Sequence, residues 1–341
     1  MRQVREAKVP EDRASELIPR LFDDGIADPS ARITRAEGFR LVPIKEERCG
    51  DAIALGLEMI TGPAYSEQSR PPMERIKDIL DDIPSYDLAH LPEKWEIAGD
   101  VVTVKLRPSL FQYGRRIGEA YAEVLGVSAV LADVSGVSGE FRVPDMKVLY
   151  GEPKESVKVE NGISYCFDVT KVMFASGNLF ERKRMEGLDC SGETVVDMFC
   201  GIGYFTLPLA KFSGVRKVFA CEKNPDSYGY LLKNIALNDV GDVVIPILGD
   251  NRDIPGRAFA DRILMGYVQR TSEFLPKAMQ MAKPGCMVHY HDTFPVGKQE
   301  EMTFSAFSDA CGNRRFEIES IREVKSFAPS VSHYVADVRV F

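Results

Sequence analysis

A short apolar run that ends in an acidic residue and a Gly-x-Gly turn is the clearest chemical motif of the chain. It reads Val195-Val196-Asp197-Met198-Phe199-Cys200-Gly201-Ile202-Gly203, and a helix-like pattern begins at Tyr204. Glycines at a strand-to-helix turn let a nucleotide-like ligand approach the backbone where a side chain would block it. We therefore expect Asp197, Gly201 and Gly203 to belong to a ligand site.

Acidic residues also follow the next two predicted strands. Glu222 ends the second strand, where a carboxylate can accept hydrogen bonds from both ribose hydroxyls. Asp250 and Asn251 follow the third strand, where a carboxylate or an amide can contact the adenine edge. One acidic strand end by itself is a common capping or solubility feature. Three at successive strand ends predict an adenosine-type cofactor.

The residue at the third glycine of the motif distinguishes between the possible cofactors. Thr206 stands where G-x-G-x-x-G has its last glycine, which allows close helix packing at a pyrophosphate. S-adenosyl-L-methionine (AdoMet) has no phosphate to bind. The turn therefore favours AdoMet over NAD or FAD.

Three further segments carry residues that could do chemistry. The cations Arg182-Lys183-Arg184 follow Glu181 and could bind a cofactor carboxylate or an RNA phosphate, although a solvated helix face explains them equally well. The fourth strand ends in Met265-Gly266-Tyr267, without the Asn-Pro or Asp-Pro turn that binds the target amine in many base methyltransferases. His289-Tyr290-His291-Asp292 could transfer protons or orient a loop. No metal site is expected, because no cluster has ligand spacing.

Composition bounds the class of protein. The 341 residues include seven scattered cysteines, without a CxxC pair. This pattern excludes a zinc ribbon and favours a reducing compartment, so we expect a cytoplasmic protein. No apolar stretch approaches the length of a membrane span, and we do not expect the protein to bind a membrane. A net charge of −8 argues against a polyanionic partner without excluding one.

The elements that must position these residues alternate between strand and helix. We predict five strands, separated by helices, at 194–198, 217–221, 243–248, 262–265 and 286–289. Such alternation implies a doubly wound parallel sheet of the α/β class. Two strands at 316–323 and 334–341 would add an antiparallel hairpin, which is the layout of the class I AdoMet-dependent methyltransferase-like fold. We expect a region of unassigned role at 1–90, a smaller α+β module at 91–172 and an AdoMet-binding catalytic domain at 173–341.

Taken together, these motifs resemble a known family, the archaeal wybutosine-synthesising 3-amino-3-carboxypropyltransferases. Their relatives are the tRNA (guanine-37-N1)-methyltransferases. The resemblance covers about residues 90–341 and rests on the segments Phe174–Arg182, 197–205, Glu222-Lys223-Asn224-Pro225, Asp250–Asp253, 265–268 and 289–292. It implies transfer of the aminocarboxypropyl group of AdoMet to C7 of 4-demethylwyosine at position 37 of tRNA(Phe), with release of 5′-methylthioadenosine.

The resemblance also implies cofactor contacts from Arg182, Glu222, Asp250 and Asn251. Ala175-Ser176 stands where the family has Ser-Lys, and we place Ser176 in the same site. The fourth strand end favours the transferase, since the methyltransferases carry Asn-Leu-Pro there. A guanine-37 N1-methyltransferase, a non-catalytic RNA-binding protein and a small-molecule methyltransferase are the alternatives. The sequence does not identify a general base.

Overall fold

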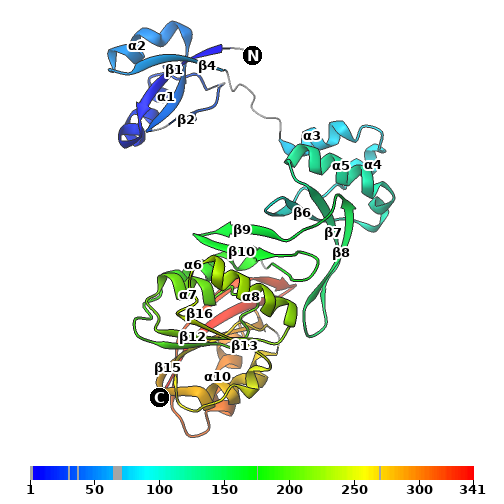
Figure 1. Ribbon diagram of the computed structural model, residues 1–341, viewed down its shortest axis with the longest axis vertical. Helices are drawn as coiled ribbons and strands as arrows, with labels where there is room; N and C mark the ends of the chain where they lie inside the picture. The colour runs from blue at the N-terminus through cyan, green and yellow to red at the C-terminus, as the bar shows by residue number, and fades with distance from the viewer. Residues whose placement is uncertain (1–2, 30, 37, 64–70, 175, 269) are drawn as a thin grey trace. The chain divides into compact units, whose positions relative to one another are not determined.

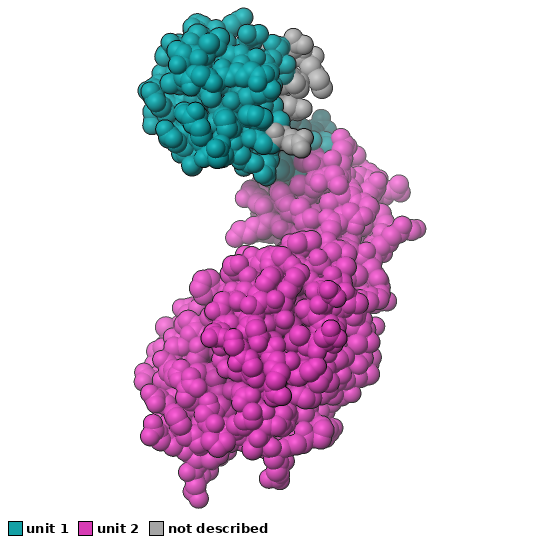
Figure 2. Space-filling model, turned by 60° about the vertical axis from the view of Figure 1, so that its left-hand side comes forward, with its two compact units in different colours: residues 1–82 teal, residues 83–341 magenta. Residues whose placement is uncertain are grey.

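The computed structural model describes residues 3–29, 31–36, 38–63, 71–174, 176–268 and 270–341. The chain forms two compact units, residues 1–82 and 83–341, which are coloured separately in Figure 2. None of the described helices combines the length and the apolar character that a bilayer span requires.

The first unit is built on a four-stranded antiparallel sheet in the order β2-β3-β1-β4. Its elements are β1 (Gln3–Pro10), α1 (Ala14–Asp23), β2 (Thr34–Ala36), β3 (Phe39–Ile44), α2 (Cys49–Ala54), β4 (Glu58–Pro63) and α3 (Pro72–Ile79). Val9 and Val42 of the sheet pack against Leu17 and Leu21 of α1, and these four side chains are buried. The unit therefore has a hydrophobic core of its own.

The second unit begins with a small α+β module. It contains α4 (Ser85–Leu88), β5 (Trp95–Ala98), β6 (Val101–Lys105), α5 (Gly114–Leu125), β7 (Ala129–Ser138) and β8 (Val143–Tyr150), with the sheet order β5-β6-β7-β8. Helix α5 packs closely on the sheet because Gly118 has no side chain. A Cβ there would lie 2.8 Å from the Cβ of Tyr150. The residue pattern predicts strands at 94–97 and 101–106 and a helix around 116–125, and β5, β6 and α5 confirm them. It does not predict β7 and β8.

A separate hairpin joins this module to the larger domain. It consists of β9 (Ser156–Glu160) and β10 (Ile163–Phe167) and pairs only with itself among the described strands. Asn234 and Asn238 of helix α8 (Pro225–Leu237, with Asn238 as its C-cap) accept hydrogen bonds from the backbone of Cys166 (2.7 Å) and Ser164 (2.9 Å). Side-chain amides therefore attach the hairpin to α8.

A seven-stranded sheet in the order β13-β12-β11-β14-β15-β17-β16 forms the larger domain (Figure 1). The first five strands are parallel, and β17 runs antiparallel between β15 and β16. Their bounds are β11 (Thr194–Asp197), β12 (Lys217–Glu222), β13 (Val244–Leu248), β14 (Ala260–Met265), β15 (Ala282–Pro295), β16 (Phe316–Ala328) and β17 (Val331–Val340). The predicted parallel sheet with a closing hairpin is confirmed, and the fold is that of the class I methyltransferases.

Helices cover both faces of this sheet. Adjacent strand residues point to opposite faces, so Val195 of β11 packs with α6 (Leu179–Glu186) and α7 (Thr206–Phe212), on the face that α8 also covers. Val196 packs on the other face, with α9 (Leu275–Met281) and α10 (Gln299–Cys311). Both valines are fully buried. The apolar run that the sequence analysis identified is thus a central strand.

Candidate active site

The glycine turn lies between β11 and α7, at the carboxyl edge of the sheet. Gly201 has φ +58° and Gly203 has φ +102°, a region that side-chain-bearing residues rarely adopt. A Cβ on Gly203 would lie 2.7 Å from Cγ of Leu207, and one on Gly201 would lie 2.9 Å from Cε2 of Tyr204. Backbone conformation and space therefore both require glycine here.

Asp197 ties the start of this turn to its end. The side chain is completely buried. One carboxylate oxygen accepts a hydrogen bond from Oγ1 of Thr206 at 2.8 Å, and the other accepts one from the backbone N–H of Phe199 at 3.3 Å. Burial raises the pKa of Asp197 to about 7, and these two hydrogen bonds act in the opposite direction. Its position fixes the shape of the turn.

Glu222, at the end of β12, is held against the turn. Its Oε2 accepts from the N–H of Gly201 at 2.8 Å, and its Oε1 accepts from the N–H of Asn224 at 2.7 Å. Burial raises the pKa of Glu222. Because each carboxylate oxygen has two lone pairs, both oxygens can accept a further bond from a ligand.

Asp250 and Asn251 follow β13 and lead into the short helix η5 (Asn251–Asp253). Asp250 pairs with Arg252 at 2.6 Å and with Lys223 at 3.2 Å, and the hydrogen bonds from Arg252 hold its pKa well below its usual range. Asn251 is buried, and its Nδ2 donates to the backbone oxygen of Met198 at 2.9 Å. Its Oδ1 is buried and has no hydrogen-bond partner in the part of the chain that the structure describes.

These residues fit an adenosine-type ligand. The structure brings Asp197, Gly201, Gly203, Glu222 and Asn251 together around one turn. A buried acceptor without a partner costs free energy unless something donates to it, and Asn251 Oδ1 is such an acceptor. The two glycines let Tyr204 and Leu207 pack against the turn, which fixes the backbone next to Glu222.

Arg182 and Ser176 lie on the upstream segment. Arg182, on α6, is 1% exposed and forms two bonds with the carboxylate of Glu160, at 2.5 and 2.9 Å. Its guanidinium carbon lies 4.9 Å from the ring centre of Phe174. Ser176 begins the short helix η4 (Ser176–Asn178), and its side chain lies outside what the structure describes. A cofactor contact from either residue stays a prediction.

The fourth strand end lies beside the glycine turn. A Cβ on Gly266 would lie 3.1 Å from Cε2 of Phe205, the residue that precedes α7. The ring of Tyr267 stacks on that of Phe199, with centroids 5.0 Å apart. Backbone and aromatic rings thus occupy the place where an amine-binding turn would offer side-chain oxygens.

Sequence analysis missed a contact between the small module and this site. The turn between β7 and β8 carries Glu140, which pairs with Lys223 at 2.6 Å, and Phe141, whose backbone oxygen accepts from Nδ2 of Asn224 at 3.1 Å. Both partners directly follow Glu222. The alternation of polar and apolar residues over Val143–Tyr150 was the available signal, because it is typical of a strand.

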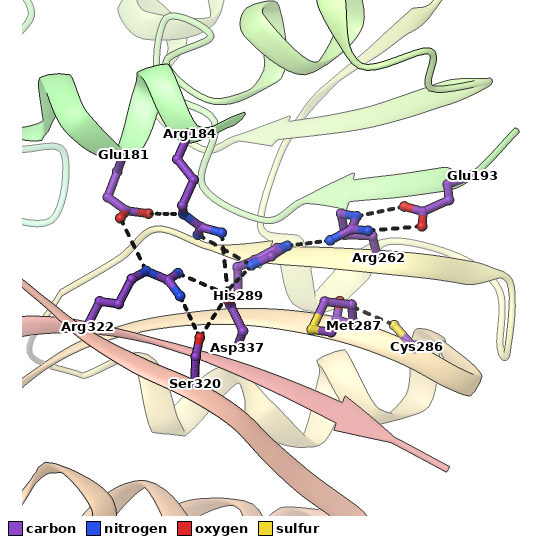
Figure 3. Close-up of polar contacts among 10 residues, drawn as sticks. All are labelled: Glu181, Arg184, Glu193, Arg262, Cys286, Met287, His289, Ser320, Arg322 and Asp337. Atoms are coloured by element: carbon purple, nitrogen blue, oxygen red, sulfur yellow. Dashed lines mark hydrogen bonds and ion pairs between the residues drawn. The ribbon is translucent and has the colours of Figure 1, made fainter. Parts of the chain in front are cut away.

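The histidines of β15 have different surroundings. His289 lies in the network of polar contacts drawn in Figure 3. Its Nδ1 donates to Asp337 at 2.6 Å, and its Nε2 accepts from Arg262 at 2.7 Å, because an arginine can only donate. Arg262 in turn forms two bonds with Glu193, at 2.6 and 3.0 Å. Burial lowers the pKa of His289 to about 4, so it is a neutral link with both ring nitrogens engaged.

A hollow of the second unit lies elsewhere. It has a volume of about 430 Å³ and lies at the amino edge of the sheet, opposite the glycine turn. Glu193, Arg216, Asp261, Lys283 and Arg339 are among the residues that line it. Volume therefore does not mark the candidate site, which is identified by its strand ends.

Comparison with known proteins agrees with this geometry. Residues 76–154 match the family model described as the TYW2 N-terminal domain, and residues 156–319 match the TRM5/TYW2 methyltransferase domain. The tRNA(Phe) (4-demethylwyosine(37)-C(7)) aminocarboxypropyltransferase of Pyrococcus horikoshii is 46% identical over 270 residues, which are 78% of this chain and 96% of that protein.

Two further relatives extend the comparison. The crystal structure of P. horikoshii TYW2 in complex with MeSAdo superposes with a TM-score of 0.72 at 43% identity, covering 79% of this chain and 99% of that one. The tRNA (guanine(37)-N(1))-methyltransferase Trm5b of Pyrococcus abyssi is 32% identical over 98% of each chain. The chain therefore belongs to the TRM5/TYW2 family and, within it, to the family of archaeal aminocarboxypropyltransferases that act in wybutosine synthesis.

Proposed function

We propose that the chain transfers the 3-amino-3-carboxypropyl group of AdoMet to C7 of 4-demethylwyosine at position 37 of tRNA(Phe), with release of 5′-methylthioadenosine. The activity named for the P. horikoshii relative supports this acceptor, since that relative aligns with 78% of the chain. The RNA partner in this proposal is the anticodon region of tRNA(Phe), which contains position 37.

The residues around the glycine turn would hold the cofactor. Glu222 would accept hydrogen bonds from the ribose hydroxyls, and Asn251 Oδ1 would accept from the adenine amine. Asp250, already paired with Arg252 and Lys223, adds negative charge at the same edge. Gly201 and Gly203 would let the methionine part lie against the backbone.

The fourth strand end is the observation that carries the choice of reaction. Met265-Gly266-Tyr267 offers no side-chain amide or carboxylate to bind a guanine N–H, and its neighbours Phe199 and Phe205 are aromatic. When bound, AdoMet supplies a sulfonium-activated γ-carbon whose bond to sulfur breaks as 5′-methylthioadenosine leaves. The protein contributes by positioning, because the carbon that faces the acceptor decides which group moves.

Two separately labelled forms of AdoMet test the proposal. tRNA(Phe) carrying 4-demethylwyosine is incubated with the protein and with AdoMet labelled in the methyl group or in the carboxyl carbon. We expect carboxyl label in the tRNA and methyl label in released 5′-methylthioadenosine. The control is tRNA(Phe) with unmodified guanosine at position 37, which should take up neither label.

The second candidate is guanine-37 N1-methylation, which the likeness to Trm5b over 98% of the chain favours. The same assay distinguishes it. Methyl label in the unmodified control tRNA supports the methyltransferase and rejects the transferase. Absence of both labels, together with no AdoMet binding by calorimetry, supports a non-catalytic RNA-binding protein.

A further inference from the structure

The proposed transfer leaves one task without a residue, because the acceptor carbon must lose a proton. A pair of buried histidines lies close to the fourth strand end. Nδ1 of His291, on β15, is 3.1 Å from Nε2 of His333, on β17, and the two residues are 1% and 2% exposed. They are neighbours on one face of the sheet, although 42 residues separate them in the sequence.

The Nε2 atom of His291 is buried, and no described residue forms a hydrogen bond with it. This distinguishes His291 from His289, both of whose ring nitrogens are engaged. If His291 carries its proton on Nδ1 and donates it to His333, the Nε2 atom has a free lone pair. A buried lone pair without a donor is a group that requires a ligand or a proton.

Phe205 connects this histidine to the site. Its ring stacks on that of His291, with centroids 5.3 Å apart and planes at 22°. The same ring lies against Gly266, where an added Cβ would be 3.1 Å from Cε2. The ring of Phe205 therefore contacts both the imidazole and the fourth strand end.

We infer that His291, with His333 behind it, accepts the proton that the acceptor carbon loses in the proposed transfer. The inference rests on that function. The acceptor carbon uses a π electron pair to form the new carbon–carbon bond, which leaves a positive charge on the nucleobase ring. His291 Nε2 then takes the proton, and the C–H electron pair returns to the ring. His333 stabilises the resulting imidazolium by accepting from its Nδ1–H.

The surroundings of the pair keep both imidazoles unprotonated before the transfer. His291 faces His333 and Asp337 on β17, Arg184 on α6 and His289 on β15, and His333 faces Lys325 on β16 and Arg142 from the β7–β8 turn. Burial first, and then these cations, lower the pKa of His333 to about 4 and that of His291 well below its usual range. Both rings are therefore neutral at physiological pH. A weak base is sufficient, since the cationic ring formed in the transfer is a strong acid.

The test is a kinetic isotope effect in single turnovers. The substrate is tRNA(Phe) with protium or deuterium at C7 of 4-demethylwyosine, and the proteins are wild type, His291→Asn and His333→Asn. For His291→Asn we expect a rate lower by roughly 10²- to 10⁴-fold, the range of general-base contributions. A primary isotope effect should appear, because proton loss becomes rate-limiting. AdoMet affinity, measured by calorimetry, should stay within about threefold of wild type.

His289→Asn is the matched control, because it also removes a buried imidazole from β15. It should lower the melting temperature without producing an isotope effect. An unchanged rate, or a slow rate without an isotope effect, in folded His291→Asn overturns the inference. If His291→Asn does not fold, the His333→Asn variant tests the inference instead. Loss of the His333 imidazole should also slow proton transfer to His291 and reveal the isotope effect. A wild-type protein that transfers no carboxyl label rejects the proposed function itself.

Discussion

Replacement of Glu222 by glutamine tests how the carboxylate at the end of β12 works. Its two oxygens accept from the N–H groups of Gly201 and Asn224 at 2.8 and 2.7 Å. An amide can offer only one oxygen, so an NH2 group must face one of these N–H donors. A hydrogen bond to a charged group contributes about 1.5–3 kcal/mol, and we expect the free energy of unfolding to fall by roughly that amount.

The same substitution weakens the proposed ribose contact. One of two charge-assisted acceptors is lost, and about 1.4 kcal/mol corresponds to a tenfold change in affinity, so the AdoMet Kd should rise about 10- to 100-fold. Calorimetric titration measures the affinity, and urea denaturation measures the stability. Glu301→Gln, at an exposed site on α10, is the control and should change neither. Binding of AdoMet to Glu222→Gln within about twofold of wild type would refute the reasoning.

Three further predictions follow from the same contacts. Gly203→Ala should lower both stability and AdoMet affinity, because φ is +102° and the new Cβ would meet Leu207. Denaturation measures the stability and calorimetry measures the affinity. An unchanged Kd contradicts the prediction. Folding raises the pKa of Asp197 from 3.8 to about 7, so between these pH values the folded protein binds a proton that the unfolded chain does not. The free energy of unfolding therefore falls as the pH rises from about 4 to about 7. Asp197→Asn should therefore gain stability relative to wild type between pH 5 and pH 7.5 in urea titrations, and a constant difference contradicts this. His289→Asn should cost about 1–3 kcal/mol, since Arg262 or Asp337 loses a buried partner; thermal denaturation measures it, and an unchanged melting temperature would count against the network.

Local sequence patterns were sufficient for the larger sheet. Each parallel strand is an apolar run, because both of its faces are covered by helices, and the glycines mark a turn where no side chain fits. The first unit was harder. The pattern at Gly38–Ile44 predicts a strand, which β3 confirms. Strands β1, β2 and β4 pair across the unit without a strong alternation of their own.

Side-chain pairing at the site depended on distant residues. Arg182 meets Glu160, 22 residues away, and His291 meets His333, 42 residues away. No local period encodes such pairs, because strand order brings them together. The predicted strand at 286–289 also ended too early, since β15 continues to Pro295 along its antiparallel partner β17. His291 therefore lies inside a strand, where a loop was equally plausible.

Three consecutive residues at the end of β12, Glu222 to Asn224, contact three different parts of the protein. Glu222 accepts a hydrogen bond from the glycine turn, and Lys223 and Asn224 contact the β7–β8 turn. Asn224 also caps helix α8, because its Oδ1 accepts from the N–H of Asp226 at 2.9 Å. Thermodynamic linkage is reciprocal. A ligand that binds Glu222 more tightly when the small module is docked therefore favours the docked position, and a partner that stabilises the docked module favours that ligand by the same free energy.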